Sequence, residues 1–279
     1  METRSKGISY VLAGVLLMSL DAVFVRLSGL PGWNASFLFG LFSFIAMCLF
    51  TQFFQEGVVT AIRNGGAVII LSGMIMGGSG NTFVLAVKET AVANVVLIMS
   101  STPLFSALFS RIFLKEKTGA KTWIATAVTL AGIFIIVKGS LTSEGIKGDL
   151  LAVAATAFAS FNYVLWRKYP KISRSMAVGM GGFFIALFSS FGMQASSFNL
   201  YGVAVMAVMG LLTAPFGRTF VSTSARYIMA TEISLYSLLR TVITPVIIWA
   251  VFREMPPSAT FFGGSLMMAS VLWYIMSKK

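Results

Sequence analysis

The stretch "GMIMGGSGNTFV" (residues 73–84) recurs 137 residues later as "GLLTAPFGRTFV" (210–221). The two copies share their first glycine, a second glycine seven residues further on, and the ending Thr-Phe-Val. Self-similarity between distant segments of one chain indicates an internal duplication. We therefore expect a fold built from two related halves.

The flanking sequence supports this duplication. At an offset of 141, residues 7–50 align with residues 148–191 through several shared glycine, alanine and phenylalanine positions. Further along, "FLKE" (113–116) and "VFRE" (251–254) each close an apolar run ahead of a last one. The two halves are therefore expected to span residues 1–140 and 141–279.

The composition places both halves in a membrane. Of the 279 residues, 57% are hydrophobic and 11% are charged, and the mean hydropathy is +0.87. Soluble domains are only about 45–50% apolar, and a helix needs about 20 apolar residues to cross a bilayer. The apolar runs predict ten transmembrane helices, at 8–27, 34–53, 66–87, 91–113, 121–138, 149–167, 175–196, 200–221, 231–252 and 258–276.

Ten helices in two copies leave five helices in each copy. Because five is odd, the second copy enters the membrane from the side opposite to the first. The sequence thus predicts an all-α polytopic membrane protein made of two inverted five-helix repeats. Inverted repeats of this kind are typical of secondary transporters.

The formal net charge of +12 reflects topology. Lys and Arg gather in the loops that become cytoplasmic when the N-terminus is cytoplasmic, mainly around residues 111–121 and 167–174. This bias predicts that both termini are cytoplasmic. No basic groove interleaved with aromatic residues is visible, so we expect no nucleic-acid partner.

The string Gly-x-Ser-Gly raises the possibility that Ser79 is a nucleophile in an intramembrane protease. A serine nucleophile needs a general base, usually histidine, and the chain contains no histidine. Phe216 replaces Ser79 in the second copy, Cys48 is the only cysteine, and the two aspartates, Asp21 and Asp149, lie far apart in sequence. We therefore expect neither an enzyme nor a metal or cofactor site.

The repeated glycines suggest flexible points in two helices. Glycine weakens a helix by about 1 kcal/mol relative to alanine, and proline removes a backbone hydrogen bond. A hinge near each membrane face would suit alternating access; the alternative is that small residues only allow close helix packing. The hinge candidates are Gly77, Gly78, Gly80, Pro215 and Gly217.

Ionisable residues inside a span are costly and mark functional candidates. Asp21, which aligns with Asn162, could carry a coupling proton or contact a substrate amine, or it could pair with Arg26 or Lys88 near the interface. Arg240 could hold a substrate carboxylate, or its side chain could extend to the inner headgroups.

Arg218 lies near the end of its predicted helix, so we expect its side chain to extend to the headgroups. A small polar solute would also need orienting groups and an apolar pocket. With Arg240, the candidates for substrate binding are Ser79, Asn81, Met99, Phe158, Asn162, Trp166, Phe216 and Tyr236.

The segments "NVVLIMSSTPLFSALFSRIFLKEKTGAKTWIATAVTLAGIFIIVKG" (94–139) and "EISLYSLLRTVITPVIIWAVFREMPPSATFFGGSLMMASVLWYIM" (232–276) share one pattern. Each has a proline-containing apolar helix, a Lys-Glu or Arg-Glu ending and a last helix rich in small residues. The chain resembles the EamA-type family of the drug/metabolite transporter superfamily, and the resemblance covers nearly the whole chain. The spacing from proline to glutamate differs between the copies, by about one helical turn.

This resemblance implies export of small metabolites from the cytoplasm, and within the family the pattern is similar to exporters of aromatic amino acids. The expected function is therefore a secondary transporter for amino acids with apolar or aromatic side chains, working by alternating access in the lipid bilayer. Toxic organic cations and other metabolites are alternative substrates. A membrane protein that transports no solute, such as a lipid scramblase, is the alternative of another class. The oligomeric state is not readable from the sequence.

Overall fold

A computed structural model describes residues 2–115, 119–140, 145–169, 171–224, 227, 236–237 and 239–277. These residues form helices joined by short connections, and no β-strand occurs among them. An all-helical fold is expected in lipid, where a helix satisfies its backbone hydrogen bonds within its own segment.

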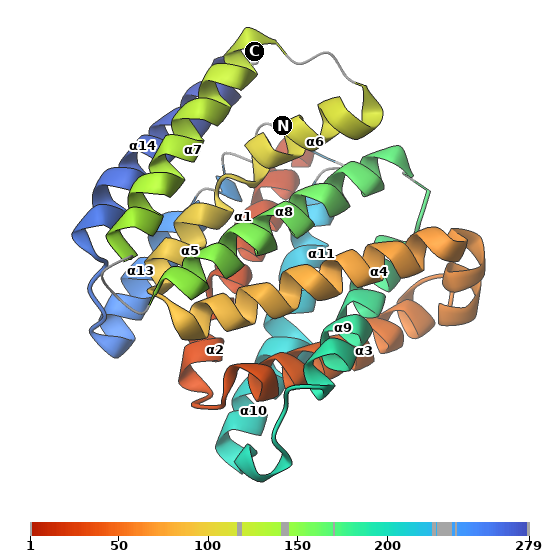
Figure 1. The fold of residues 1–279 in the computed structure, drawn as a ribbon. Helices are drawn as coiled ribbons and strands as arrows, with labels where there is room; N and C mark the ends of the chain where they lie inside the picture. The colour runs from red at the N-terminus through yellow and green to blue at the C-terminus, as the bar shows by residue number, and fades with distance from the viewer. Residues whose placement is uncertain are drawn as a thin grey trace.

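The helices follow one another with short breaks (Figure 1). In the first half they are α1 (Glu2–Ser19), α2 (Asp21–Leu27), α3 (Gly32–Phe54), α4 (Val58–Glu89), α5 (Val92–Met99), α6 (Thr102–Leu114) and α7 (Ala120–Ser140). In the second half they are α8 (Ile146–Lys168), α9 (Arg174–Ser190), η1 (Ala195–Ser197), α10 (Leu200–Val208), the π-helical turn η2 (Met209–Thr213), α11 (Ala214–Ser224), α13 (Leu239–Phe252) and α14 (Ser258–Ser277).

Seven helical segments of the described chain are long and apolar enough to cross a membrane, and Leu239–Phe252 is a shorter apolar helix. The chain is therefore an all-helical multi-pass membrane protein, as the composition predicts. The count of ten spans and the inverted relation between the halves stay predictions. The first part of the expected helix 231–252 lies outside the described residues, apart from 236 and 237.

Several predicted bounds are wrong: the helix expected at 8–27 begins at Glu2, and those expected at 91–113 and 200–221 are each interrupted. In α4 a helical segment from Val58 precedes the helix expected at 66–87, and its polar residues Arg63 and Asn64 lie on an exposed side. A break occurs inside it at Gly66, whose φ of 52° and ψ of −143° are not helical. The helix expected at 175–196 ends at Ser190, where the carbonyl of Ser189 accepts hydrogen bonds from two following backbone amides.

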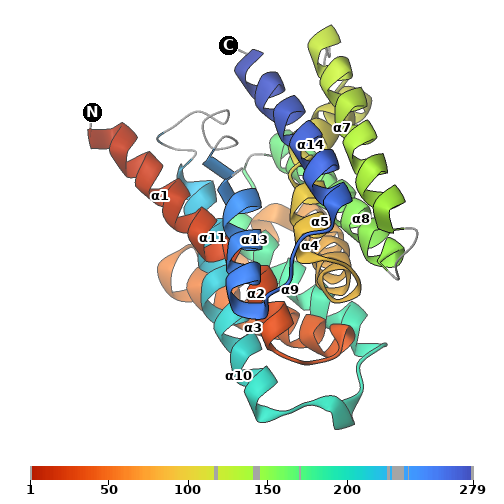
Figure 2. The same cartoon turned by 90° about the vertical axis from the view of Figure 1, so that its left-hand side faces the viewer.

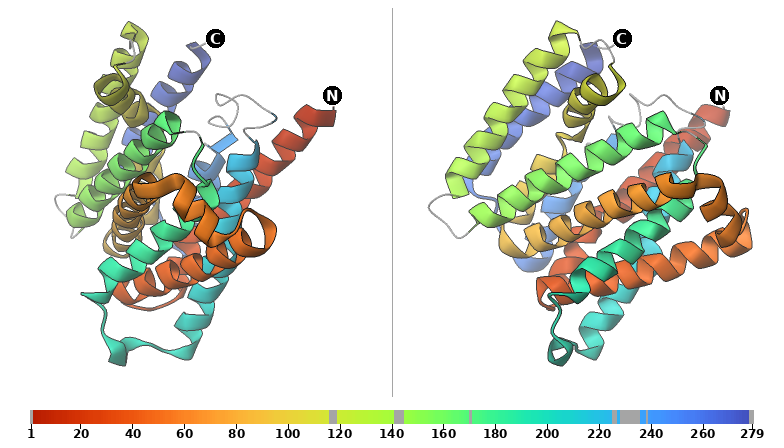
Figure 3. Two further views of the ribbon diagram at one scale, coloured as in Figure 1. Left: turned by 90° about the vertical axis from the view of Figure 1, so that its right-hand side faces the viewer. Right: turned by 45° about the vertical axis from the view of Figure 1, so that its right-hand side comes forward.

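The helices pack in pairs that join distant parts of the sequence. Contacts join α3 to α9, α4 to α8, α1 to α11, and α7 to α14. The right panel of Figure 3 shows α8, α4, α9 and α3 following one another across the molecule, and each neighbouring pair of these is in contact. The largest cluster of buried apolar residues lies between these elements and includes Phe39, Phe83 and Met209. In Figure 2 the start of α1 and the end of α14 lie at the same end of the molecule.

Glycine pairs allow the closest helix contacts. A Cβ built on Gly40 of α3 would lie 2.6 Å from the carbonyl oxygen of Gly182 in α9, and one on Gly182 would lie 2.7 Å from that of Gly40. Gly132 of α7 and Gly263 of α14 meet in the same reciprocal way, at 2.8 and 2.6 Å. Such small-residue crossings are the usual means by which membrane helices approach closely.

The crossing of α3 and α9 gives a test of this packing. In an open helix, glycine to alanine stabilises by about 1 kcal/mol. We expect Gly40→Ala to destabilise the protein instead, by about 1–3 kcal/mol, because the new methyl group meets backbone atoms of α9. Thermal unfolding of the purified protein in detergent measures the change.

Gly119→Ala is the matched control, because a Cβ on Gly119 meets no atom within 4 Å. A melting temperature for Gly40→Ala equal to or above that of the unmodified protein would contradict the close crossing.

Candidate functional site: a buried charged cluster

A break in the first span places Asp21 at the start of a new helix. The chain leaves α1 at Ser19 and begins α2 at Asp21, and the Ser19 hydroxyl donates to the carbonyl of Val15 at 2.7 Å. The carbonyl of Ser19 accepts a hydrogen bond of 3.1 Å from the Thr244 hydroxyl of α13. This contact ties the break to α13, and the first turn of α2 is a favourable place for a carboxylate.

Asp21 is completely buried and faces two arginines. Its Oδ2 lies 3.8 Å from Nη2 of Arg218 in α11, and Arg240 of α13 acts on the same carboxylate electrostatically. Within the described part of the chain, neither carboxylate oxygen of Asp21 has a hydrogen-bond partner, and the Nε of Arg240 has none either. The Arg218 side chain is 28% exposed and donates to the carbonyl of Ala214 at 3.0 Å.

Each guanidinium of this cluster lies over a phenylalanine ring. The Arg218 guanidinium carbon is 5.7 Å from the ring centre of Phe39, and that of Arg240 is 5.8 Å from the ring centre of Phe83. Both rings are nearly fully buried. Cation–π contacts of this kind gain strength when water is excluded. They hold the guanidiniums within the bundle, between the two halves of the chain.

The charged groups of this cluster do not use all of their hydrogen-bond donors and acceptors. Buried charged groups are normally paired and hydrogen-bonded, because an unsatisfied one is costly. Two guanidiniums face one carboxylate, so donors outnumber the acceptor. A guanidinium binds a carboxylate through two parallel hydrogen bonds, and a carboxylate accepts hydrogen bonds from an ammonium group. The cluster can therefore receive a solute that carries both groups.

A second buried carboxylate provides a contrast. Asp149 of α8 is also fully buried, but its Oδ1 accepts a hydrogen bond of 2.8 Å from the hydroxyl of Thr90 and one of 3.0 Å from the amide of Asn94. The amide oxygen of Asn94 in turn accepts a hydrogen bond from Thr260 of α14. These bonds fix the ends of four helical segments, and Asp149 is a structural residue.

Of the alternatives for Asp21, pairing with Arg26 does not occur in the structure, because Arg26 has other partners. Nη2 of Arg26 lies 3.6 Å from Oε1 of Glu254 and donates to the carbonyl of Thr90 at 2.7 Å. The same Glu254 oxygen accepts the backbone amide of Val92 at 3.3 Å. Arg26 therefore ties α2 to the connections that follow α4 and α13.

Four of the predicted binding residues lie at the contact of α4 with α8. The Ser79 hydroxyl donates to the carbonyl of Ala155 at 3.0 Å. The hydroxyl of Ser72 donates to Asn162 at 2.7 Å and accepts from the indole of Trp166 at 2.8 Å. Phe158 packs against Gly78, where a Cβ would lie 3.2 Å from its ring. Their polar groups hold two helices together.

The other predicted residues are dispersed. Asn81 is buried between α3, α4 and α9; its amide oxygen accepts from two serine hydroxyls, and its amide nitrogen donates to two backbone carbonyls. Met99 packs on the main core, Phe216 lies beside the rings of Phe50 and Phe220, and Tyr236 packs on a small cluster with Val221. Of the predicted binding residues, Arg240 joins the cluster at Asp21.

The hinge candidates fall into two kinds. Gly77, Gly78 and Gly80 lie in a continuous part of α4, where a Cβ on each would crowd a neighbouring side chain at 3.2 Å or less. In the second copy the chain forms the π-helical turn Met209–Thr213 directly before α11, in which Pro215 is the second residue. Isolated π-helical turns are frequently found at functional sites. The gating role of these residues stays a prediction.

Sequence reasoning missed Arg218, Phe39 and Phe83. Arg218 does not extend to the headgroups, as its position suggested; it turns toward Asp21. The signal was present, since Arg218 replaces Asn81 in an otherwise matched Gly-x-Thr-Phe-Val ending. A charge introduced into one copy of a repeat marks a place where the two halves differ in chemistry. No cluster of metal-binding side chains is found in the described parts of the chain.

The sequence of this chain is similar to those of known transporters. Residues 5–138 match the EamA-like transporter family. An S-adenosylmethionine uptake transporter of Rickettsia felis is 24% identical over 290 aligned positions, which cover 100% of this chain and 95% of that protein. The uncharacterized transporter YyaM of Bacillus subtilis is 26% identical over 79% of this chain and 77% of its own.

The fold is also found in a crystal structure. That protein superposes with a TM-score of 0.63 over 98% of each chain, at 16% sequence identity. At this identity the likeness concerns the fold alone.

The ion pair of Asp21 and Arg218 can be tested by a double-mutant cycle. We expect Arg218→Gln to lower the free energy of unfolding by about 3 kcal/mol, because it removes the nearest cation from a buried carboxylate. Asp21→Asn in the same background should recover most of the loss. Unfolding in detergent measures both, and Arg111→Gln, at an exposed arginine over Trp123, is the control. Strictly additive effects would mean that the two residues do not interact.

Proposed function

We propose that the chain is a secondary carrier for small solutes with an amino-acid head group, because residues 5–138 match the EamA-like transporter family. In this proposal the buried cluster of Asp21, Arg218 and Arg240 binds that head group. The observation that carries it is the buried carboxylate of Asp21, which has Arg218 as an ion-pair partner and Arg240 within electrostatic reach but accepts no hydrogen bond from the described residues. Ionisable groups at such depth are functional by default.

The chemistry of the cluster defines the substrate class. Arg240 and Arg218 would hold the carboxylate, and Asp21 would accept hydrogen bonds from the ammonium group. Amino acids with apolar or aromatic side chains have this head group, and so does S-adenosylmethionine, the solute named for the relative of Rickettsia felis. Toxic organic cations lack the carboxylate, so the excess of guanidinium groups disfavours them.

We propose alternating access between two inverted repeats, residues 1–140 and 141–279. Helix pairing supports this arrangement: α3 contacts α9 and α7 contacts α14, and in each pair a helix meets its expected counterpart. The glycine contacts in both pairs are reciprocal, as a two-fold relation requires. A carrier without ion coupling is reversible, so export and uptake would both follow the solute gradient.

We place the protein in a bacterial inner membrane with both termini in the cytoplasm. The two ends of the described chain lie at one end of the molecule, which agrees with an even number of spans (Figure 2). The basic residues near the ends of α6 and α8 support the same orientation through the positive-inside rule.

Counterflow in liposomes tests the substrate class. We expect labelled phenylalanine or S-adenosylmethionine to exchange against unlabelled solute with saturation, and we expect Arg240→Gln to lower this exchange at least tenfold, because the carboxylate loses its bidentate partner. Arg111→Gln, at the exposed end of α6, should leave it unchanged. Exchange of choline alone would favour the organic-cation alternative.

Absence of exchange for all three solutes, with lipid transfer between leaflets present, would support a scramblase instead. Thermal unfolding of Arg240→Gln is the control: loss of exchange reports on substrate binding only if the variant unfolds as a folded protein does.

The π-helical turn before Pro215 gives a second test, of the hinge. We expect Pro215→Ala to slow exchange severalfold while the substrate concentration for half-maximal binding stays the same. The physical reason is that alanine restores the backbone donor and favours a regular α-helix across the turn. If Pro215→Ala weakened substrate binding as much as it slowed exchange, the role of Pro215 would be in packing.

A further inference from the structure

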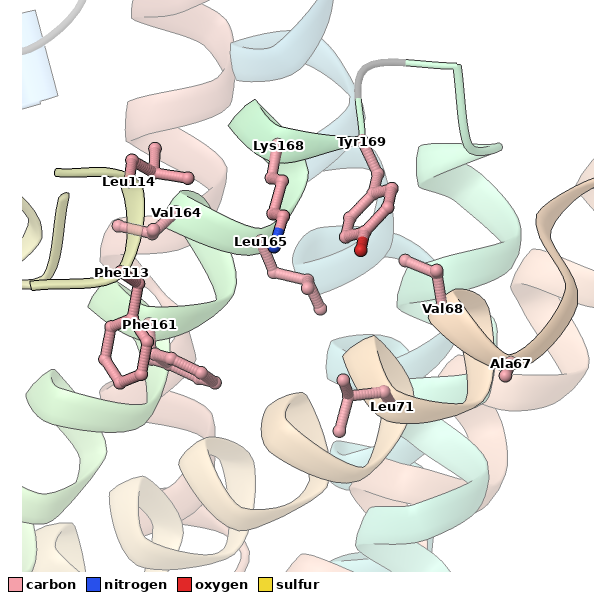
Figure 4. A pocket seen from close by; sticks show the side chains of 10 residues that line it. All are labelled: Ala67, Val68, Leu71, Phe113, Leu114, Phe161, Val164, Leu165, Lys168 and Tyr169. Carbon is pink, nitrogen blue, oxygen red and sulfur yellow. The ribbon is translucent and has the colours of Figure 1, made fainter. Parts of the chain in front are cut away.

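An apolar cavity of ≈ 320 Å³ lies between α4, α6 and α8. Figure 4 shows Leu71 and Val68 of α4 on one side and Phe113, Leu114 and Phe161 on the other. Its size falls at the lower end of the range for small-ligand pockets, about 300–1,000 Å³. None of its lining residues belongs to the charged cluster at Asp21.

The cavity opens sideways to the membrane. Leu71 and Phe113 line it, yet 46% and 53% of their surfaces are exposed, and both belong to membrane-spanning segments. Lipid tails surround such surfaces in a bilayer. A cavity with apolar walls that opens to hydrocarbon is therefore filled by hydrocarbon, since water would leave its hydrogen bonds unmade there.

One end of the cavity carries a positive charge. Lys168, in the last turn of α8, is the charged residue among those that line it, and its Nζ lies 5.7 Å from the ring centre of Tyr169. In Figure 4 the ammonium group points toward the cavity beside Leu165. The cation–π contact with Tyr169 holds the ammonium at this edge.

The ends of the helices that line the cavity are also rich in basic residues. Further basic residues lie at the ends of α6 and α8 and at the start of α9, namely Arg111, Lys115, Lys171 and Arg174. Basic pockets between membrane helices on the cytoplasmic side are suited to anionic headgroups, because that leaflet is negatively charged. The walls of the cavity thus fit an acyl chain, and its edge fits a phosphate.

We propose that this cavity binds an acyl chain of an anionic phospholipid, with the lipid phosphate at the ammonium group of Lys168. The lipid would lie between α4, α6 and α8, beside residues of α8 other than those that bond Ser72. It would fill the space between α4 and α6 of the first repeat and α8, the first helix of the second repeat. The site goes beyond solute transport and does not depend on which solute is carried.

Native mass spectrometry of the detergent-purified protein tests the proposal. Phosphatidylglycerol and phosphatidylcholine with identical acyl chains are titrated separately. We expect the first phosphatidylglycerol to bind about fivefold more tightly, the effect of one lysine near an anionic lipid. Lys168→Gln should remove this preference, and Lys168→Arg should keep it. Lys138→Gln, at an exposed lysine in the last turn of α7 that does not line the cavity, is the matched control.

A second variant tests the cavity itself. Leu71→Trp fills the space and should reduce the first binding event for both lipids; Val68→Phe serves the same purpose if Leu71→Trp does not fold. Equal affinities for the two lipids, or a Lys168→Gln variant that binds as the unmodified protein does, would overturn the proposal. Unchanged lipid binding in the filled variant, together with lost solute exchange, would place the cavity on the solute path and overturn it as well.

Discussion

Helices in a bilayer gain little by burying apolar side chains against one another, since the surrounding lipid is equally apolar. Their arrangement depends instead on close backbone approach, and in this molecule glycine pairs provide it. A Cβ on Gly14 of α1 would lie 2.7 Å from the carbonyl of Gly217 in α11. Arg218 directly follows Gly217, and Asp21 lies just beyond the end of α1. The close contact of these two helices therefore brings the arginine to the aspartate. The charged cluster is a consequence of the same packing that joins the two halves.

The sequence was sufficient to predict an all-helical membrane protein, because each apolar helix can be recognised locally as an apolar run bounded by polar or glycine-rich breaks. Helices α3, α7, α8 and α14 begin and end within a few residues of their predicted bounds. The prediction was wrong where local signals conflicted, as at Arg63 and Asn64, whose polarity suggested a loop although they extend α4 on an exposed side. Hydropathy alone cannot distinguish an exposed turn of a helix from a loop that connects two helices.

The candidate site was predicted less well, because a partner in space has no signature in one sequence. Asp21 and Arg240 were recognised as costly residues, but Arg218 was not among the partners considered for Asp21, and Arg26, which was, pairs with Glu254. Asn81 and Asn162 were recognised as polar groups in spans, yet neighbouring serines use their hydrogen-bonding capacity. Burial of a polar group marks it as important. Only its contacts decide whether it joins helices or remains available to a ligand.

The excess of guanidinium groups at Asp21 has an electrical consequence. The described cluster carries two arginines and one carboxylate, so without a solute it holds at least one positive charge in excess. A charge that crosses the full membrane potential gains or loses about 2.3 kcal/mol per 100 mV. A carrier that exposes this cluster first to one side and then to the other would work against voltage when empty. An amino-acid head group carries one positive and one negative charge, so its binding leaves this excess in place, and the membrane potential would act on the loaded carrier as it acts on the empty one.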